Sequence, residues 1–121
     1  MKEANSFLKA GEIARLATKV ASEKQASDVL MLDVGGVCSF ADYFVICSGD
    51  TKRHIEAVWQ GIIDEMKKSG VALYHKEGTS DSGWMLVDFG SVIIHIFTPP
   101  ERDYYQLDKL WSKAIPVLRI Q

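Results

Sequence analysis

Three aspartates, Asp33, Asp42 and Asp88, lie at or near the ends of predicted β-strands. Carboxylates in such positions bind the metal ions that polymerase-like nucleotidyltransferases use for phosphoryl transfer. Those enzymes carry a Gly-Ser pair followed by an Asp-x-Asp pattern, whereas this chain has Gly35-Gly36 and no Asp-x-Asp on a predicted strand. The sequence therefore favours aspartates that cap turns and accept backbone N–H bonds. A divergent metal-dependent nucleotidyltransferase stays open as the alternative.

The histidines and cysteines do not form a catalytic or metal-binding pattern. His54, His75 and His95 are scattered, without the spacing of a zinc site. His95 stands inside an apolar predicted strand, where a lone histidine is more often a hydrogen-bonded structural group than a ligand. Cys38 and Cys47 are too few for a disulfide framework, and neither has a neighbouring cation in the sequence that would activate a thiolate. The sequence predicts no catalytic residue, no metal and no cofactor.

Two tryptophans stand where they could serve either the core or a binding surface. Trp84 directly follows the polar, glycine-bounded loop 77–83, and Trp111 closes the last predicted helix. Packing in the core is the more common role for both. A tryptophan at the junction of a loop and a sheet is also a frequent anchor of protein–protein interfaces. The residues alone indicate a compact α/β domain without a recognisable catalytic constellation.

The length of 121 residues fits one domain with one core, spanning residues 1–121. A net charge of -2 and a pI of about 5.9 argue against a broad basic face. We therefore expect little or no direct sequence-specific binding to nucleic acid. The N-terminal residues lack the apolar core of a signal peptide, and no apolar run reaches membrane-spanning length, so no membrane association is expected. A reducing cytoplasm is the expected compartment.

Hydrophobic periodicity predicts an α/β fold, with a mixed sheet of about five strands flanked by helices. The helices are expected from Glu12 to 25–28, from Asp50 or Thr51 to Lys68, and from Pro99 to Trp111. The strands are expected at 29–34, 43–47, 71–76, 84–87 and 92–97. The connector between the first two strands is too short for a crossover helix, so they should be antiparallel neighbours. Residues 1–10 and 116–121 are expected to be loose, the latter because Pro116 cannot continue the last helix.

The stretch Gly83–Phe97 predicts a β-hairpin, because two apolar runs flank a glycine-containing turn. Phe89 is a poor residue for positive φ, so we expect a type I turn with Gly90 as a left-handed bulge residue. That register would place Trp84 and His95 on opposite faces of the sheet. A slip of one residue would place them on the same face.

The pattern as a whole resembles a known family. The block Phe40–Gly49, followed by Arg53-His54, resembles the Asp-Tyr-Phe-Val-Ile-Cys-(Thr/Ser)-Gly block of the Iojap family, the ribosomal silencing factors (RsfS). Further matches extend the resemblance over residues 12–111, nearly the whole domain. They are Glu77-Gly78, Gly83-Trp84, Leu86, Asp88, Gly90, Val92, His95-Ile96-Phe97, Arg102, Tyr105, Leu107 and Leu110-Trp111.

The resemblance implies a nucleotidyltransferase-like α/β fold without the catalytic acids, and therefore a protein that is not an enzyme. It implies binding to the large ribosomal subunit through ribosomal protein L fourteen. Occupying that protein would block association with the small subunit and repress translation when nutrients are scarce, as in stationary phase. A large-subunit biogenesis factor, a role known for organelle relatives, and a homodimeric interaction module stay open as alternatives.

By the family motif, the expected partner-binding residues are Trp84, Asp88, Glu77, His95, Arg102 and Tyr105. The tryptophan would supply buried area, and the acidic residues would face lysine or arginine side chains of a basic ribosomal protein. Two local departures from the family pattern occur. Gly90-Ser91 stands where the family usually has Gly-Asp, which removes one negative charge, and Cys38-Ser39-Phe40 replaces a segment with paired serines.

Overall fold

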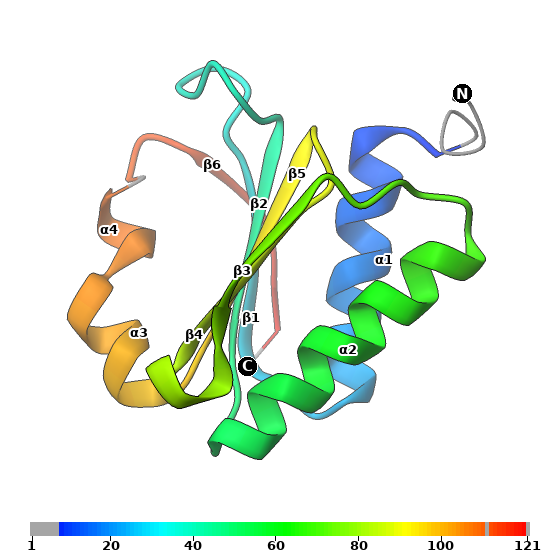
Figure 1. Cartoon of the computed structure of the whole chain (residues 1–121). Helices are drawn as coiled ribbons and strands as arrows, with labels where there is room; N and C mark the ends of the chain where they lie inside the picture. Colours follow the sequence, from blue (N-terminus) through cyan, green and yellow to red (C-terminus); the bar gives the residue numbers. More distant parts are fainter. Residues whose placement is uncertain (1–7, 111, 121) are drawn as a thin grey trace.

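The computed structural model describes residues 8–110 and 112–120 as an α/β fold built on a six-stranded mixed sheet (Figure 1). The helices are α1 (Ala10–Glu23), α2 (Lys52–Lys68), α3 (Pro99–Tyr105) and α4 (Leu107–Leu110), with the 3-10 helix η2 (Ser80–Ser82). The strands are β1 (Ser27–Asp33), β2 (Tyr43–Ser48), β3 (His75–Thr79), β4 (Trp84–Asp88), β5 (Val92–Phe97) and β6 (Ile115–Ile120). The predicted fold class is confirmed, and the sheet has one strand more than expected.

The strands lie in the order β3-β4-β5-β2-β1-β6. β2 and β5 run parallel, and every other neighbouring pair is antiparallel, including the predicted pair β1 and β2. Helices α1 and α2 cover one face of the sheet and α3 and α4 the other, and we call these the α1 face and the α3 face (Figure 1). Within the described residues, no helix combines the length and apolar character needed to cross a lipid bilayer.

The core lies on both faces of the sheet, because buried side chains alternate along the central strands. On β2, Val45 and Cys47 join the cluster beneath α1 and α2, whereas Phe44 and Ile46 join the cluster on the α3 face. β5 is buried along its whole length, as expected for a strand with both faces covered.

α2 forms where the sequence signal is strongest. The hydroxyl of Thr51 caps the helix by accepting a hydrogen bond from the backbone N–H of His54 at 3.0 Å. One stripe of the helix is buried in the core, comprising Ile55, Val58, Ile62 and Met66. Lys67 and Lys68 lie in the last turn, where positive charge suits the helix dipole.

The segment from 116 to 120 is an ordered strand, so the expectation of a loose tail there is wrong. β6 pairs with β1 along the outer edge of the sheet, with Val29 opposite Ile120. Pro116 is tolerated because an edge strand has one side without ladder hydrogen bonds. Leu118 and Ile120 also pack against the core of the α1 face. Pairing with β1 and these apolar contacts together hold the segment in place.

Two other predicted elements have different bounds. The strand expected at 71–76 begins only at His75, because the turn through η2 leads directly into β4 and fixes the pairing of β3 with it. The last predicted helix is interrupted at Gln106, whose φ of 48° ends α3. Trp111 and residues 1–7 lie outside the described residues, and so do the predictions made for them.

The expected register of the β4–β5 hairpin is wrong, and the structure has the alternative that is shifted by one residue. Trp84 lies opposite Phe97, and Leu86 lies opposite His95. Directly opposite residues of an antiparallel pair point to the same face, and every second residue along a strand does too. Trp84 and His95 therefore share the α3 face of the sheet.

The loop of this hairpin explains the error. It consists of Gly90 and Ser91, since the N–H of Phe89 donates to the carbonyl of Val92 at 2.9 Å. Gly90 takes a φ of 91°, which suits a two-residue turn with glycine at its first central position. The prediction assigned Phe89 to the loop, whereas Phe89 ends the strand pairing and is buried in the core of the α1 face.

Replacing Gly90 with alanine should lower the free energy of unfolding by about 1–3 kcal/mol. Its φ of 91° is unfavourable for an L-residue, and an added Cβ would lie 2.6 Å from Cε2 of Tyr74. Gly36→Ala is the matched control, because an added Cβ there meets nothing within 4 Å, and it should change stability by less than about 0.5 kcal/mol. Urea unfolding followed by circular dichroism measures both. Equal destabilisation of the two variants would contradict the described loop.

Candidate functional site

Aromatic rings gather on the α3 face around Trp84, and we call Trp84, His95, Phe97 and Tyr105 the aromatic cluster. The ring centre of Trp84 lies 4.5 Å from that of Tyr105 and 5.3 Å from that of Phe97. It lies 5.9 Å from the ring centre of His95. These separations are in the range of favourable aromatic pairs. The cluster joins β4, β5 and α3, which follow one another along the chain.

Part of the aromatic cluster is open to solvent. Trp84 is half-buried and Tyr105 is 41% exposed. The neighbouring Tyr104 is 78% exposed, and its ring packs edge-on against Tyr105 with centres 5.0 Å apart. Large aromatic side chains that are held by packing and still reachable from solvent are typical anchors of protein interfaces. The open side of the cluster is therefore a candidate binding surface.

His95 supports this surface from below. It is buried, and its Nδ1 accepts a hydrogen bond from the indole N–H of Trp84 at 3.3 Å. Burial lowers the pKa of His95 from 6.5 to about 4, so the imidazole is neutral at neutral pH. A neutral ring with an unprotonated Nδ1 fixes the orientation of the indole. His95 acts on the surface through Trp84 and is not itself exposed.

A recess of about 150 Å³ opens beside the cluster, lined by Glu77, Gly78, Ser82, Trp84 and Leu86. Glu77 lies opposite Leu86 in the β3–β4 pairing, so both side chains point to the α3 face. The Oε2 atom of Glu77 lies 2.9 Å from Nε2 of His75, and both of these side chains are exposed. The recess combines an apolar wall with a carboxylate at its rim.

Arg102 is an expected partner-binding residue whose side chain lies inside the molecule. Its Nη1 donates to the backbone oxygen of Asp28 at 2.9 Å and to Oγ of Ser48 at 3.0 Å. Its Nη2 lies 3.4 Å from Oδ2 of Asp28, and the side chain is only 10% exposed. The guanidinium therefore joins α3 to β1 and β2.

Asp88 lies at the opposite end of β4 from Trp84. Asp88 is four positions farther along the strand, which corresponds to about 13 Å. One carboxylate oxygen of Asp88 accepts a hydrogen bond from the N–H of Gly90 at 2.7 Å. This contact stabilises the hairpin loop, a turn-capping role of the kind expected for the aspartates.

The structure thus brings together Trp84, His95 and Tyr105, with Glu77 in the adjoining recess. The other two expected residues lie apart, one at the hairpin loop and one beneath α3. Sequence reasoning missed Phe97, which stacks on Trp84. Its position two residues after His95 would have revealed it if the correct register had been assumed.

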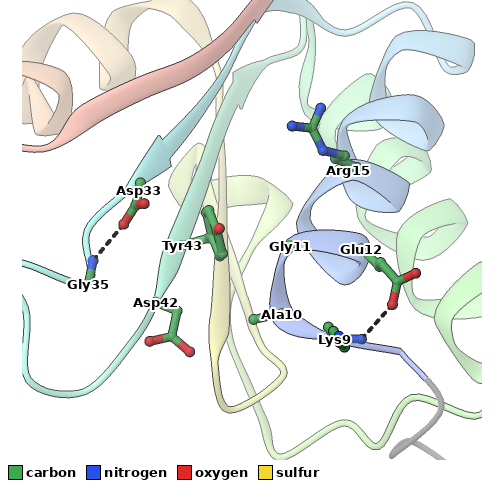
Figure 2. Close-up of a pocket in the computed structure, with 9 residues that line it drawn as sticks. All are labelled: Lys9, Ala10, Gly11, Glu12, Arg15, Asp33, Gly35, Asp42 and Tyr43. Carbon is green, nitrogen blue, oxygen red and sulfur yellow. Dashed lines mark hydrogen bonds between the residues drawn. The ribbon is translucent and has the colours of Figure 1, made fainter.

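The positions of the three aspartates bear on the nucleotidyltransferase alternative. Asp33 and Asp42 line a cleft of about 610 Å³ between the start of α1 and the adjoining ends of β1 and β2 (Figure 2). Asp33 accepts a hydrogen bond from the N–H of Gly35 at 3.0 Å, and Asp88 does not line this cleft. Among the side chains that the structure describes, no three from His, Cys, Asp or Glu residues are grouped to hold a metal ion. The three carboxylates do not converge on one site.

Cys47 is buried in β2. Burial raises the pKa of its thiol from 9.0 to about 12, and the positive charge of Arg102 offsets only part of this rise. The thiol therefore stays protonated at neutral pH and is a poor nucleophile. Cys38 is half-buried and packs against the core of the α3 face.

Comparison with known proteins gives consistent results. A family model described as "Ribosomal silencing factor during starvation" (RsfS) matches residues 8–121. The ribosomal silencing factor RsfS of Bacillus subtilis is 38% identical over 102 residues, which cover 84% of this chain and 86% of that protein. Mitochondrial assembly of ribosomal large subunit protein 1 of Mus musculus is 37% identical over 93 residues, covering 74% of this chain and 41% of that protein. A crystal structure of a protein from Chromobacterium violaceum matches with a TM-score of 0.84 at 30% identity, covering 87% of this chain and 88% of that one.

The fold and these matches show which class of protein this is: an α/β protein with the fold of the ribosomal silencing factors. The chain belongs to the RsfS family. The family is non-catalytic, so the expectation that this chain is not an enzyme is confirmed by its membership. The predicted resemblance to this family over residues 12–111 is likewise confirmed. The family model matches a longer stretch, residues 8–121.

The burial of His95 predicts a specific loss of stability in acid. The unfolded chain protonates His95 near its ordinary pKa of 6.5, whereas the folded chain does so only near 4. Lowering the pH through this window therefore favours the unfolded state, by up to about 3 kcal/mol. His95→Gln should remove this part of the pH dependence, because the amide oxygen can accept the indole hydrogen bond without titrating. Urea unfolding from about pH 7 to about pH 4.5 measures the difference, and parallel curves for the two proteins would contradict the assignment.

Proposed function

We propose that this chain binds the large ribosomal subunit through ribosomal protein L fourteen and blocks association with the small subunit. Translation would thereby be repressed when nutrients are scarce. Family membership supports this proposal, because the matching family model and the Bacillus subtilis relative are both described as ribosomal silencing factors. The bacterial relative also supports action in the cytoplasm.

The observation that carries the proposal is the half-exposed Trp84, flanked by Tyr105 on one side and the recess with Glu77 on the other. A steric block needs an interface of ordinary size with a few well-packed anchors, and it needs no catalytic group. Trp84 is suited to this role because Phe97 and His95 hold its ring in place. A side chain ordered before binding loses little conformational entropy on binding.

The recess fits one basic side chain of the partner. The apolar stem of a lysine or arginine would lie on Trp84 and Leu86, and its charge would face Glu77. Ribosomal proteins are generally basic, so a chain with a net charge of -2 is attracted to them. In the proposal, Asp88 supplies a second acidic contact farther along β4 through the oxygen that does not bind Gly90. Arg102 and His95 contribute by holding Tyr105 and Trp84.

Assembly of the large subunit is the second candidate function, because the name of the mouse relative refers to it. Both functions would use the same surface on the same subunit. They differ in whether mature subunits respond. A factor that acts only during assembly leaves the joining of finished subunits unchanged.

Adding the chain to separated mature subunits should reduce the amount of joined ribosomes found by sucrose-gradient sedimentation. Trp84→Ala should restore joining and weaken binding to large subunits by about thirtyfold, because it removes the proposed anchor. Trp59→Ala is the control, since Trp59 packs against the core of the α1 face, on the opposite side of the sheet from the aromatic cluster. Unimpaired joining with wild-type protein would refute the silencing role. Equal binding by the two tryptophan variants would refute the anchor.

Reversing the charge of Glu77 at the recess should weaken binding without lowering the stability of the fold. Glu77→Lys is expected to weaken binding to large subunits by about tenfold or more, because like charges would meet in the interface. Glu56→Lys makes the same change of net charge on an exposed position of α2, on the opposite face, and should have less than about a threefold effect. Binding measured at two salt concentrations distinguishes the two variants. Equal effects would mean that only net charge matters and that the recess takes no basic side chain.

A further inference from the structure

The position of α3 is weakly determined by apolar packing. The helix has seven residues, and none of its apolar side chains is buried. It ends at Gln106, which adopts a left-handed conformation. Nevertheless α3 carries Tyr105, whose ring lies 4.5 Å from that of Trp84. Besides the ring contacts of Tyr105 and the buried Leu107 that follows the helix, two polar contacts hold α3 where its tyrosine meets the tryptophan.

The first of these contacts lies at the start of α3. The N–H of Thr98 donates to the carbonyl of Gly83 at 2.9 Å. A Cβ on Gly83 would lie 2.6 Å from Cγ of Glu101 and 2.7 Å from Oγ1 of Thr98. The glycine therefore lets the beginning of the helix approach the start of β4. This contact fixes one end of α3 and leaves the other end to a different interaction.

The second contact is made by Arg102, one turn before the end of α3. Its guanidinium reaches the backbone oxygen and the carboxylate of Asp28 and the hydroxyl of Ser48, at 2.9, 3.4 and 3.0 Å. Asp28 belongs to β1 and Ser48 to β2, so a single side chain ties the helix to two central strands. We call these three residues the clamp.

Asp28 has a backbone geometry suited to the clamp. Its φ is 47°, and the pairing of β1 with β2 shifts register between Ser27 and Leu30. A bulge of this kind re-aims a side chain, and aspartate tolerates a left-handed conformation better than most residues. Both the carbonyl and the carboxylate of Asp28 consequently face Arg102. The carboxylate also lies 3.3 Å from Nη1 of Arg119 on β6.

The clamp borders a depression that is open to solvent. The depression has a volume of about 210 Å³ and is lined by Asp28, Arg102, Asp103, Gln106 and Lys109. On this side the end of α3 therefore faces water, and the nearest buried apolar residue is Leu107, in the next helix.

From this geometry we infer that Asp28 is a positioning residue for partner binding. It holds Arg102, Arg102 holds the end of α3, and α3 holds Tyr105 against Trp84. Asp28 lies outside the aromatic cluster, and its effect on the partner passes through the helix. The inference rests on the proposed function, because its consequence is measured as binding to large ribosomal subunits.

Asp28→Asn tests the inference with little change in shape, since asparagine also tolerates the left-handed conformation. The variant keeps the carbonyl that accepts from Arg102 and removes the charge. Binding to isolated large subunits should weaken about three- to tenfold. The indole N–H resonance of Trp84 should shift, because the ring current of Tyr105 acts on it, and amides of α3 should exchange with solvent faster. Amides of β1, β2 and β5 should keep their protection.

Arg119→Gln is the matched control, because it removes the other charged contact of Asp28 on the side of β6. It should leave the Trp84 resonance in place and binding within about twofold of wild type. A combined Asp28→Asn and Arg102→Gln variant should bind no more weakly than Arg102→Gln alone, because both substitutions act on the same contact.

Three outcomes would overturn the inference. One is unchanged binding by Asp28→Asn while Trp84→Ala binds weakly, which leaves the proposed function standing and removes only the clamp. Another is loss of protection throughout the sheet, which makes Asp28 a general stability residue. The third is failure of the wild-type chain to bind large subunits, which refutes the proposed function and the inference together.

Discussion

The pairing of β4 with β5 determines on which side of the sheet each surface residue lies. Trp84 opposite Phe97 and Leu86 opposite His95 put four side chains on the α3 face. The pairing depends on a loop of two residues, and Gly90 supplies the positive φ that this loop requires. With a shift of one residue, the indole would face α1 and α2, where the core is already filled. The partner surface is therefore a direct consequence of hairpin geometry.

The surface has a rigid base and a less rigid cover. Phe97 and His95 lie on β5, which is buried along its length and hydrogen-bonded on both sides. Tyr105 lies on a short helix without buried apolar side chains, held by polar contacts at its two ends. Apolar packing in the sheet cannot readily change, whereas a polar contact beside a solvent-filled depression can. A partner that binds Trp84 therefore finds its indole on a fixed support of Phe97 and His95, beside a Tyr105 ring that can adjust its position.

Local signals explain which elements could be predicted from the sequence. α2 was predicted because its cap and its apolar stripe lie within one segment, and β1 and β2 because they are continuous apolar runs. β6 was missed because its partner β1 is distant in the chain and Pro116 suggested an end to regular structure. Trp84 and Tyr105 could be named from a family motif. Their contact could not, because it depends on the hairpin register and on an arginine that reaches a strand far away in sequence.

The pairing of β1 with β6 has a consequence for the synthesis of the chain. Val29 is made early, but its neighbour Ile120 is made much later. Until residues 115–120 have been synthesised, β1 has one unpaired edge, and the sheet cannot reach its final width. Contacts so distant in the chain form slowly, and an exposed strand edge favours aggregation. During translation, the growing chain therefore presents an incomplete sheet until its final strand closes that edge.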